Sequence, residues 1–389
     1  MTDSTPWQPP AGATPPVPPS PYAAPTGATP PPPGAAPGWT APPKPGLIPL
    51  RPLTLGTLLA AAFQVLRRNP RPTFGFALLI TGGIFLLTLV VVGVVSFFAI
   101  SRTLNASEAD AQTLEAGSIA IIILSALVPG ALGIVGTAIL QGVISLEVAR
   151  GTVGEKLKLR GLWRGAKGRI GALIGWSLLI TAVIIVGIAV LAGLIGLLIA
   201  FGGTAGLVIG VLLAFAVGIG AVVLFAWLGT KLSLVPSALM LERLPLRAAI
   251  ARSWTLTNGY FWRTLGITLL VGVIIQVVAS VLTAPLSIVF GLGTVLIDPN
   301  GTNEGVIIGG LVLYLLTIVF TIIFGAISAV VQSATPALIY IDLRMRKEGL
   351  DLELSRFVEA RQAGDRSVAD PYLTSASDAP ATPDASPWQ

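Results

Sequence analysis

Long apolar stretches separated by short polar segments dominate the pattern of this 389-residue chain. The longest, from Ile170 to Thr230, holds 61 consecutive residues without Asp, Glu, Lys or Arg. About 20 apolar residues cross a bilayer as a helix, so this stretch has room for two crossings and a turn, which we place at 201–206. In water, a helix of this length would have no polar face. The pattern therefore predicts membrane-spanning helices.

Four further apolar stretches each predict one crossing: 74–100, 118–146, 264–297 and 305–341. Lys and Arg gather in four amphipathic segments, which hold 21 of the 24 cations: 47–73, 147–169, 231–263 and 342–361. The alternate segments 101–117 and 298–304 are polar and acidic, with Arg102 as their one cation. Because an excess of Lys and Arg marks the cytoplasmic side, we expect six crossings of the plasma membrane with both termini in the cytoplasm.

The crossings show signs of an internal repeat. The run Gly75–Ile80 matches Gly175–Ile180, and Gly266–Leu270 has a similar pattern at the corresponding position before crossing five. Each run follows a basic amphipathic segment and precedes two crossings. This predicts an all-α polytopic membrane helix bundle of three units, each an interfacial helix plus a helical hairpin. The alternative is that apolar, low-complexity sequence aligns with itself by chance.

Composition separates the tails from this membrane domain, which we place at 47–361. Residues 1–46 contain 17 of the 31 prolines, and such a segment cannot bury enough apolar surface to fold. We expect it to be a disordered cytoplasmic tail, serving either as a Pro-rich docking segment or as a spacer. Residues 362–389 predict a second disordered cytoplasmic tail. The net charge of +6 follows from the cations at one membrane face, so no nucleic-acid partner is expected.

The chain has neither Cys nor His. This excludes disulfides, thiolate zinc sites and His-based acid–base catalysis. The predicted crossings also lack charged residues, which mark ion and proton pathways in membrane proteins. We therefore expect no enzyme, no catalytic or metal site and no cofactor.

Three sets of polar residues are candidates for other roles. Glutamines within the crossings would either line a polar cavity or bond neighbouring helices: Gln141, Gln276 and Gln332. Cations beside the crossings could contact anionic lipid headgroups: Arg67, Arg68, Arg71, Lys167, Arg169 and Arg263. Acid–base pairs at the hairpin exits would either neutralise each other or contact a soluble partner: Glu147/Arg150, Glu242/Arg243 and Asp342/Arg344.

Short motifs resemble a known family. The runs Arg51–Gly56, Leu66–Pro70 and Tyr340–Leu352 are similar to actinobacterial membrane proteins of the glycerophosphoryl diester phosphodiesterase membrane domain family. The resemblance covers about 47–355 and implies a helical membrane module of unknown role. Phosphodiesterases of that family add a soluble barrel with His, Glu and Asp around a divalent metal. This chain has no His and no stretch long enough for that barrel, so the activity does not carry over.

The sequence favours a non-enzymatic accessory or scaffold module whose partners are membrane lipids and a cytoplasmic or membrane protein. The alternative is a transporter or lipid-handling protein with a path between the repeats. The uncharged crossings speak against that alternative, whereas the repeat and the many glycines favour it.

Overall fold

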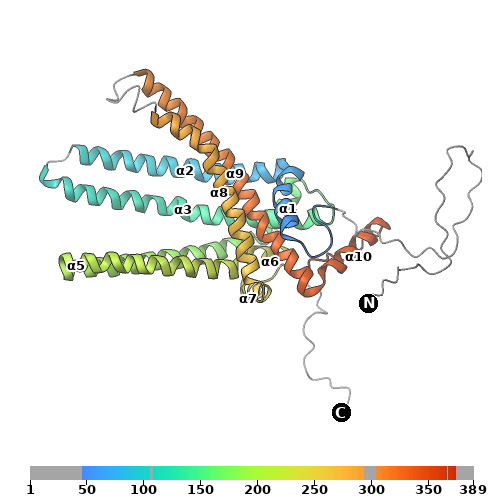
Figure 1. The fold of residues 1–389 in the computed structure, drawn as a ribbon. Helices are drawn as coiled ribbons and strands as arrows, with labels where there is room; N and C mark the ends of the chain where they lie inside the picture. The colour runs from blue at the N-terminus through green and yellow to red at the C-terminus, as the bar shows by residue number, and fades with distance from the viewer. Residues whose placement is uncertain (1–45, 106–107, 293–303, 366, 374–389) are drawn as a thin grey trace, which may run out of the picture. The chain divides into compact units, whose positions relative to one another are not determined.

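The computed structural model describes residues 46–105, 108–292, 304–365 and 367–373, in which all regular structure is α-helical (Figure 1). Five of the helices are long and apolar enough to cross a membrane: α2 (Pro70–Leu104), α3 (Glu108–Thr152), α5 (Ile170–Leu232), α8 (Phe261–Leu292) and α9 (Glu304–Glu348). This confirms the expected class, an all-helical membrane protein with several apolar helices. The predicted tail 1–46 lies outside the described residues except for Gly46.

Helix α5 is interrupted at Gly203, inside the turn that we place at 201–206. Gly203 has φ +54° and ψ −133°, a conformation that glycine adopts readily because it has no Cβ. Just after this break the chain comes back onto itself. A Cβ added to Gly206 would lie 1.8 Å from the carbonyl oxygen of Leu198. Helix α5 therefore consists of two arms joined by a tight glycine turn.

Shorter helices connect and follow the long ones: α1 (Leu55–Arg68), α4 (Leu159–Lys167), α6 (Val235–Leu241), α7 (Leu246–Thr257) and α10 (Leu350–Gln362). Helix α1 begins after Thr54, whose hydroxyl accepts a hydrogen bond from the backbone N–H of Thr57 at 3.3 Å. It buries one face, including Leu58 and Val65, and exposes Phe63 on another. The amphipathic segment predicted before the first crossing is thus a helix.

The predicted polar loop 101–117 is mostly helical, which corrects our expectation. Helix α2 continues to Leu104 and α3 begins at Glu108. Glu, Ala, Gln and Leu are frequent in the first turns of α3 and are good helix formers, so their backbone stays in the helix after the apolar run ends. Most of the acidic turn predicted at 298–304 lies outside the described residues.

The buried core lies at one end of the long helices. It contains the last turns of α3 and α9, the starts of α5 and α8, and helices α1 and α6. Helix α9 is central, because it contacts α1, α2, α3, α6, α7, α8 and α10. By contrast, only 0% to 11% of the residues in the most apolar window of each candidate span are buried. Most of the spanning surface therefore remains free for lipid or for another membrane protein.

Candidate functional site

Three carboxylates near the C-terminal ends of helices are buried in the core. Glu147 lies near the end of α3, Glu242 directly after α6, and Asp342 near the end of α9. Their residues are only 3%, 6% and 1% exposed. A buried charge is costly unless it is paired and hydrogen-bonded, so the partners of these carboxylates define how the core is held together.

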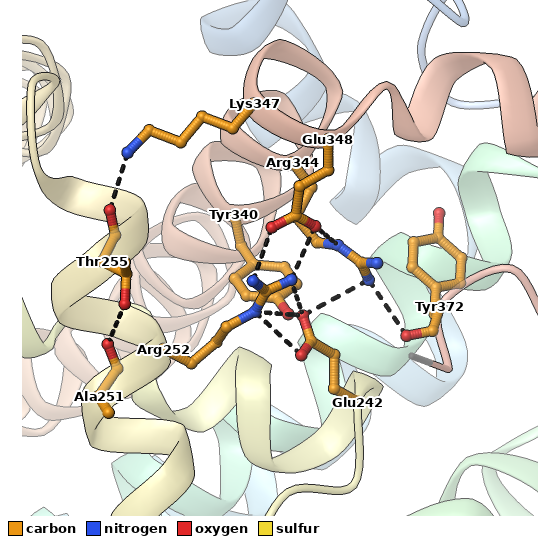
Figure 2. A network of polar contacts seen from close by, with 9 residues as sticks. All are labelled: Glu242, Ala251, Arg252, Thr255, Tyr340, Arg344, Lys347, Glu348 and Tyr372. Atoms are coloured by element: carbon orange, nitrogen blue, oxygen red, sulfur yellow. Dashed lines mark hydrogen bonds and ion pairs between the residues drawn. The ribbon is translucent and has the colours of Figure 1, made fainter. Parts of the chain in front are cut away.

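Glu242 is the centre of a polar network that joins several helices (Figure 2). The Arg252 Nε lies 3.0 Å from both carboxylate oxygens of Glu242, and its guanidinium also bonds Glu348 at 2.7 Å. Arg344 donates from Nε to Glu348 at 2.9 Å and lies 3.6 Å from Glu242. The Tyr340 hydroxyl donates to Glu242 as well. Two carboxylates and two guanidinium groups thus join α6, α7 and α9.

The electrostatics of Arg252 follow from this arrangement. Burial by itself would lower the pKa of Arg252, but its bonds to Glu348 and Glu242 outweigh burial and raise the pKa. Arg252 is therefore held in its charged form by two carboxylates. Lys347 forms a second link between α9 and the end of α7. Its Nζ donates to the backbone oxygens of Thr255 and Asn258 at 2.7 Å each.

The segment after α10 packs onto the same core. Arg344 Nη1 donates to the backbone oxygen of Tyr372 at 3.1 Å. The Tyr372 hydroxyl is hydrogen-bonded to that of Thr152, and Arg150 forms an ion pair with Asp370. Burial raises the pKa of the Tyr372 phenol. We expected a disordered tail from residue 362, whereas Asp370 and Tyr372 in the segment 367–373 bond residues of the core. Residues 374–389 lie outside the described residues.

Asp342 holds the entry of α1. One carboxylate oxygen accepts a hydrogen bond from the backbone N–H of Leu53 at 2.7 Å. Arg263 and Arg346 each lie 3.0 Å from the Asp342 carboxylate, and both also donate to the Leu53 carbonyl oxygen, at 2.8 and 2.7 Å. The backbone N–H and the carbonyl oxygen of Leu53 are therefore both held by side chains of α8 and α9.

Glu147 has a weaker set of partners. Its Oε1 accepts a hydrogen bond from Asn69 Nδ2 at 3.0 Å, while its Oε2 is buried without a hydrogen-bond partner among the described residues. Asn69 also donates to the carbonyl oxygen of Leu157 at 2.9 Å. The amide of Asn69 thus connects the α1–α2 junction to α3 and to the segment that follows it.

The three acid–base pairs that we expected at the exits are not formed. Arg150 bonds Asp370 instead of Glu147, and Arg344 bonds Glu348 and Tyr372 instead of Asp342. Arg243 is exposed, in a turn with φ 55°. Side chains so close in sequence point in different directions, so tertiary neighbours provide the partners instead. The carboxylates are buried and therefore do not form an exposed ring for a soluble partner.

The six cations proposed for lipid contact fall into two groups. Arg67, Arg71 and Lys167 are exposed. The others are half-buried and bond the protein itself: Arg68 donates to Gly151 and Glu155, Arg169 to Leu244, and Arg263 to Leu53 and Asp342. Only the first group is fully available to headgroups.

The structure does not bring the three glutamines together. Gln141 is half-buried and donates to the carbonyl oxygen of Ser233 at 3.2 Å. Gln276 and Gln332 expose their side chains on α8 and α9. A shared polar cavity is one of the two roles considered for the glutamines, and Gln276 and Gln332 do not line one with Gln141, because their side chains are exposed. Gln141 borders an apolar groove of about 310 Å³ between α3, α6 and the two arms of α5.

The sequence analysis missed several members of the network. It named Arg344 but missed Tyr340 and Glu348, which lie four residues before and after it on one face of a helix, and this signal could have been found. Nothing in the sequence indicates that Arg252 or Tyr372 joins them, because these contacts cross between distant elements.

The arrangement is a set of mutually neutralised ions inside a helical core. Among the described residues, no group of three or more acidic side chains could hold a metal ion. No protein-family model matches the chain, and neither the curated proteins nor the solved structures contain a detectable match. The resemblance to the phosphodiesterase membrane domain family stays a prediction. The five long apolar helices define the class, an integral multi-pass membrane protein.

Proposed function

We propose that the chain crosses the plasma membrane six times, with both termini in the cytoplasm. The two arms of α5 support this topology, because each contains roughly 30 residues and a crossing needs about 20. The cations support the orientation, since 21 of them lie in the segments at one end of the crossings.

The three-unit repeat belongs to this proposal. In each unit a polar residue just before the first crossing reaches the exit of the second, at similar separations along the chain. These contacts are Asn69 with Glu147, Arg169 with Leu244, and Arg263 with Asp342, separated by 78, 75 and 79 residues. Chance similarity between apolar runs would not produce matching polar contacts outside those runs.

Single cysteines test the topology in this Cys-free chain. Ser107→Cys, Thr204→Cys and Asn303→Cys should all react with a membrane-impermeant maleimide added outside intact cells. Lys156→Cys should react only after the cells are permeabilised. Protection of Thr204→Cys from the outside reagent would show that α5 does not cross twice.

We further propose that the protein is a non-enzymatic accessory or scaffold module. The network around Glu242 is the observation that carries this proposal. A transporter that rocks one unit against another must separate the units on one side of the membrane. Here α6 is tied to α7 and α9 by buried ion pairs, and breaking such a pair by removing one partner costs about 3–5 kcal/mol. We infer that the buried core, called the base below, holds the units in fixed positions. The apolar parts of the helices that extend from this base are free to pack against a partner protein.

A lipid-handling role is the second candidate, and the apolar groove beside Gln141 favours it. The groove is lined by apolar side chains of both α5 arms, including Trp176 and Phe225, with Gln141 and Ser233 as polar groups at its edge. A lipid acyl chain matches this lining in size and polarity.

Native mass spectrometry of the full chain released from its own membrane separates the two functions. A scaffold should carry a second protein at fixed stoichiometry. That protein should be lost when Arg252→Gln loosens the base and retained with Arg247→Gln, an exposed cation on the same helix. Retained lipid without a protein partner, reduced by Phe225→Ala, would refute scaffolding and support lipid handling.

A further inference from the structure

A basic pocket lies where α1 meets the segment after α3. It is open, has a volume of about 640 Å³ and is lined by Ala60, Phe63, Gln64, Arg67, Arg68 and Lys156. Half of the lining residues are cations, and none is a carboxylate. A pocket of this size is large enough for the headgroup of a phospholipid.

The position of the pocket along the chain places it beside the bilayer. Arg67 and Arg68 form the end of α1, and the apolar helix α2 begins at Pro70. Lys156 follows the end of α3 at Thr152. The apolar helices α2 and α3 contact each other, and these cations flank them, which is where basic residues meet anionic headgroups.

Glu155, the acidic neighbour of Lys156 in the chain, does not neutralise the pocket, although Glu147 offsets part of the charge of Arg68. Glu155 directs its carboxylate to Arg150 at 3.7 Å and to Arg361 at 3.5 Å. Its backbone oxygen, together with that of Gly151, instead fixes the guanidinium of Arg68, at 3.4 and 2.8 Å. The Arg68 Nε is buried and has no hydrogen-bond partner within the described part of the chain.

Arg67 and Lys156 are both exposed, and neither forms an ion pair in the ranges that the structure describes. One cation is thus held in place and two flexible ones flank it. Guanidinium groups bind phosphate oxygens through parallel N–H donors, and a lysine adds a mobile point charge.

We propose that this pocket binds the phosphate of an anionic phospholipid headgroup, with the exposed Arg67 and Lys156 as donors and Arg68 as a fixed positive charge in the wall of the pocket. Phe63, 39% exposed at the same site, packs against the glycerol portion of the lipid. A small soluble phosphate ester carries the same chemistry, but the bilayer presents lipid phosphate at this depth. The site is independent of the scaffold role, because it requires no protein partner.

Lipid retention in native mass spectra tests the site. The full chain is reconstituted in equimolar phosphatidylglycerol and phosphatidylcholine, extracted gently, and its bound lipids are counted. The double variant Arg67→Gln/Lys156→Gln is compared with Arg160→Gln/Arg164→Gln, which removes two exposed cations from α4. All four residues are exposed, so both variants should fold, and equal melting temperatures would verify this.

We expect the pocket variant to lose its preference for phosphatidylglycerol by about 30-fold, which is two contributions of about 1 kcal/mol converted at 1.4 kcal/mol per factor of ten. The α4 variant should lose less, because its two cations do not line the pocket. Equal losses in both variants, or no loss in either, would overturn the proposal by showing only general attraction to anionic lipid. A parallel sample in detergent receives inorganic phosphate. A phosphate adduct on the parent chain that displaces phosphatidylglycerol would keep the anion site but overturn its assignment to lipid.

Discussion

Removal of the Arg252 side chain tests whether the buried network holds the core together. Arg252→Ala deletes every contact between α7 and the carboxylates of Glu242 and Glu348. The Glu242 side chain is 1% exposed, so it depends on protein groups rather than on water while Arg252 is in place. It keeps the Tyr340 hydroxyl and Arg344, which lies at 3.6 Å.

The magnitude follows from burial. Removing one partner of a fully buried ion pair destabilises a protein by about 3–5 kcal/mol. The Arg252 side chain is 23% exposed, and Glu242 retains Arg344 as a second cation. Both facts lower the cost, and we expect a loss of about 2–3 kcal/mol in the free energy of unfolding. Arg247→Ala, on the exposed face of the same helix, should change it by less than about 0.5 kcal/mol.

Unfolding by sodium dodecyl sulfate in mixed micelles measures this difference. Trp254 on α7 packs edge-on against Trp227 of α5 with ring centroids 5.4 Å apart, so tryptophan fluorescence reports on the position of α7. A double-mutant cycle with Glu348→Ala should give a coupling energy of about 0.5–3 kcal/mol. Equal free energies of unfolding for Arg252→Ala and Arg247→Ala, together with a coupling energy of zero, would show that the network does not hold the core together. Such a result would refute the argument against a rocking mechanism.

Three further changes probe other parts of the molecule. Gly206→Val should open the turn of α5 and lower the melting temperature, because even a Cβ would lie 1.8 Å from the Leu198 carbonyl oxygen. Gly218→Val is the control, because a Cβ there meets no atom within 4 Å, and equal melting temperatures of the two variants would contradict the tight turn. Deleting residues 367–389 should destabilise the protein by about 1–3 kcal/mol through loss of the buried Tyr372, whereas deleting 374–389 should leave the unfolding midpoint unchanged. Gln141→Leu should lower the free energy of unfolding by about 0.6 kcal/mol through loss of its hydrogen bond to Ser233, while Gln276→Leu and Gln332→Leu should leave it unchanged. Equal losses at all three positions would instead support a shared polar interior.

The sequence by itself determined the class and the positions of the apolar helices. A bilayer has no water to satisfy a free backbone, so a long uncharged stretch such as 170–230 is stable there only as helix. The lengths of these helices and the glycines that interrupt them are visible in the sequence. The same holds for the amphipathic helix α1 and for the break of α5 at Gly203.

Only the tertiary structure decided which polar residues work together. The sequence places Glu242, Arg252, Tyr340 and Tyr372 in four separate segments, and the acid–base neighbours that it suggests are not the pairs that form. Helical periodicity determines the face on which a side chain lies, but not which distant helix meets that face. Buried charges select their partners after the helices have packed, because only then does desolvation make each unpaired ion costly. That is why the apolar helices could be predicted from local pattern and the buried network could not.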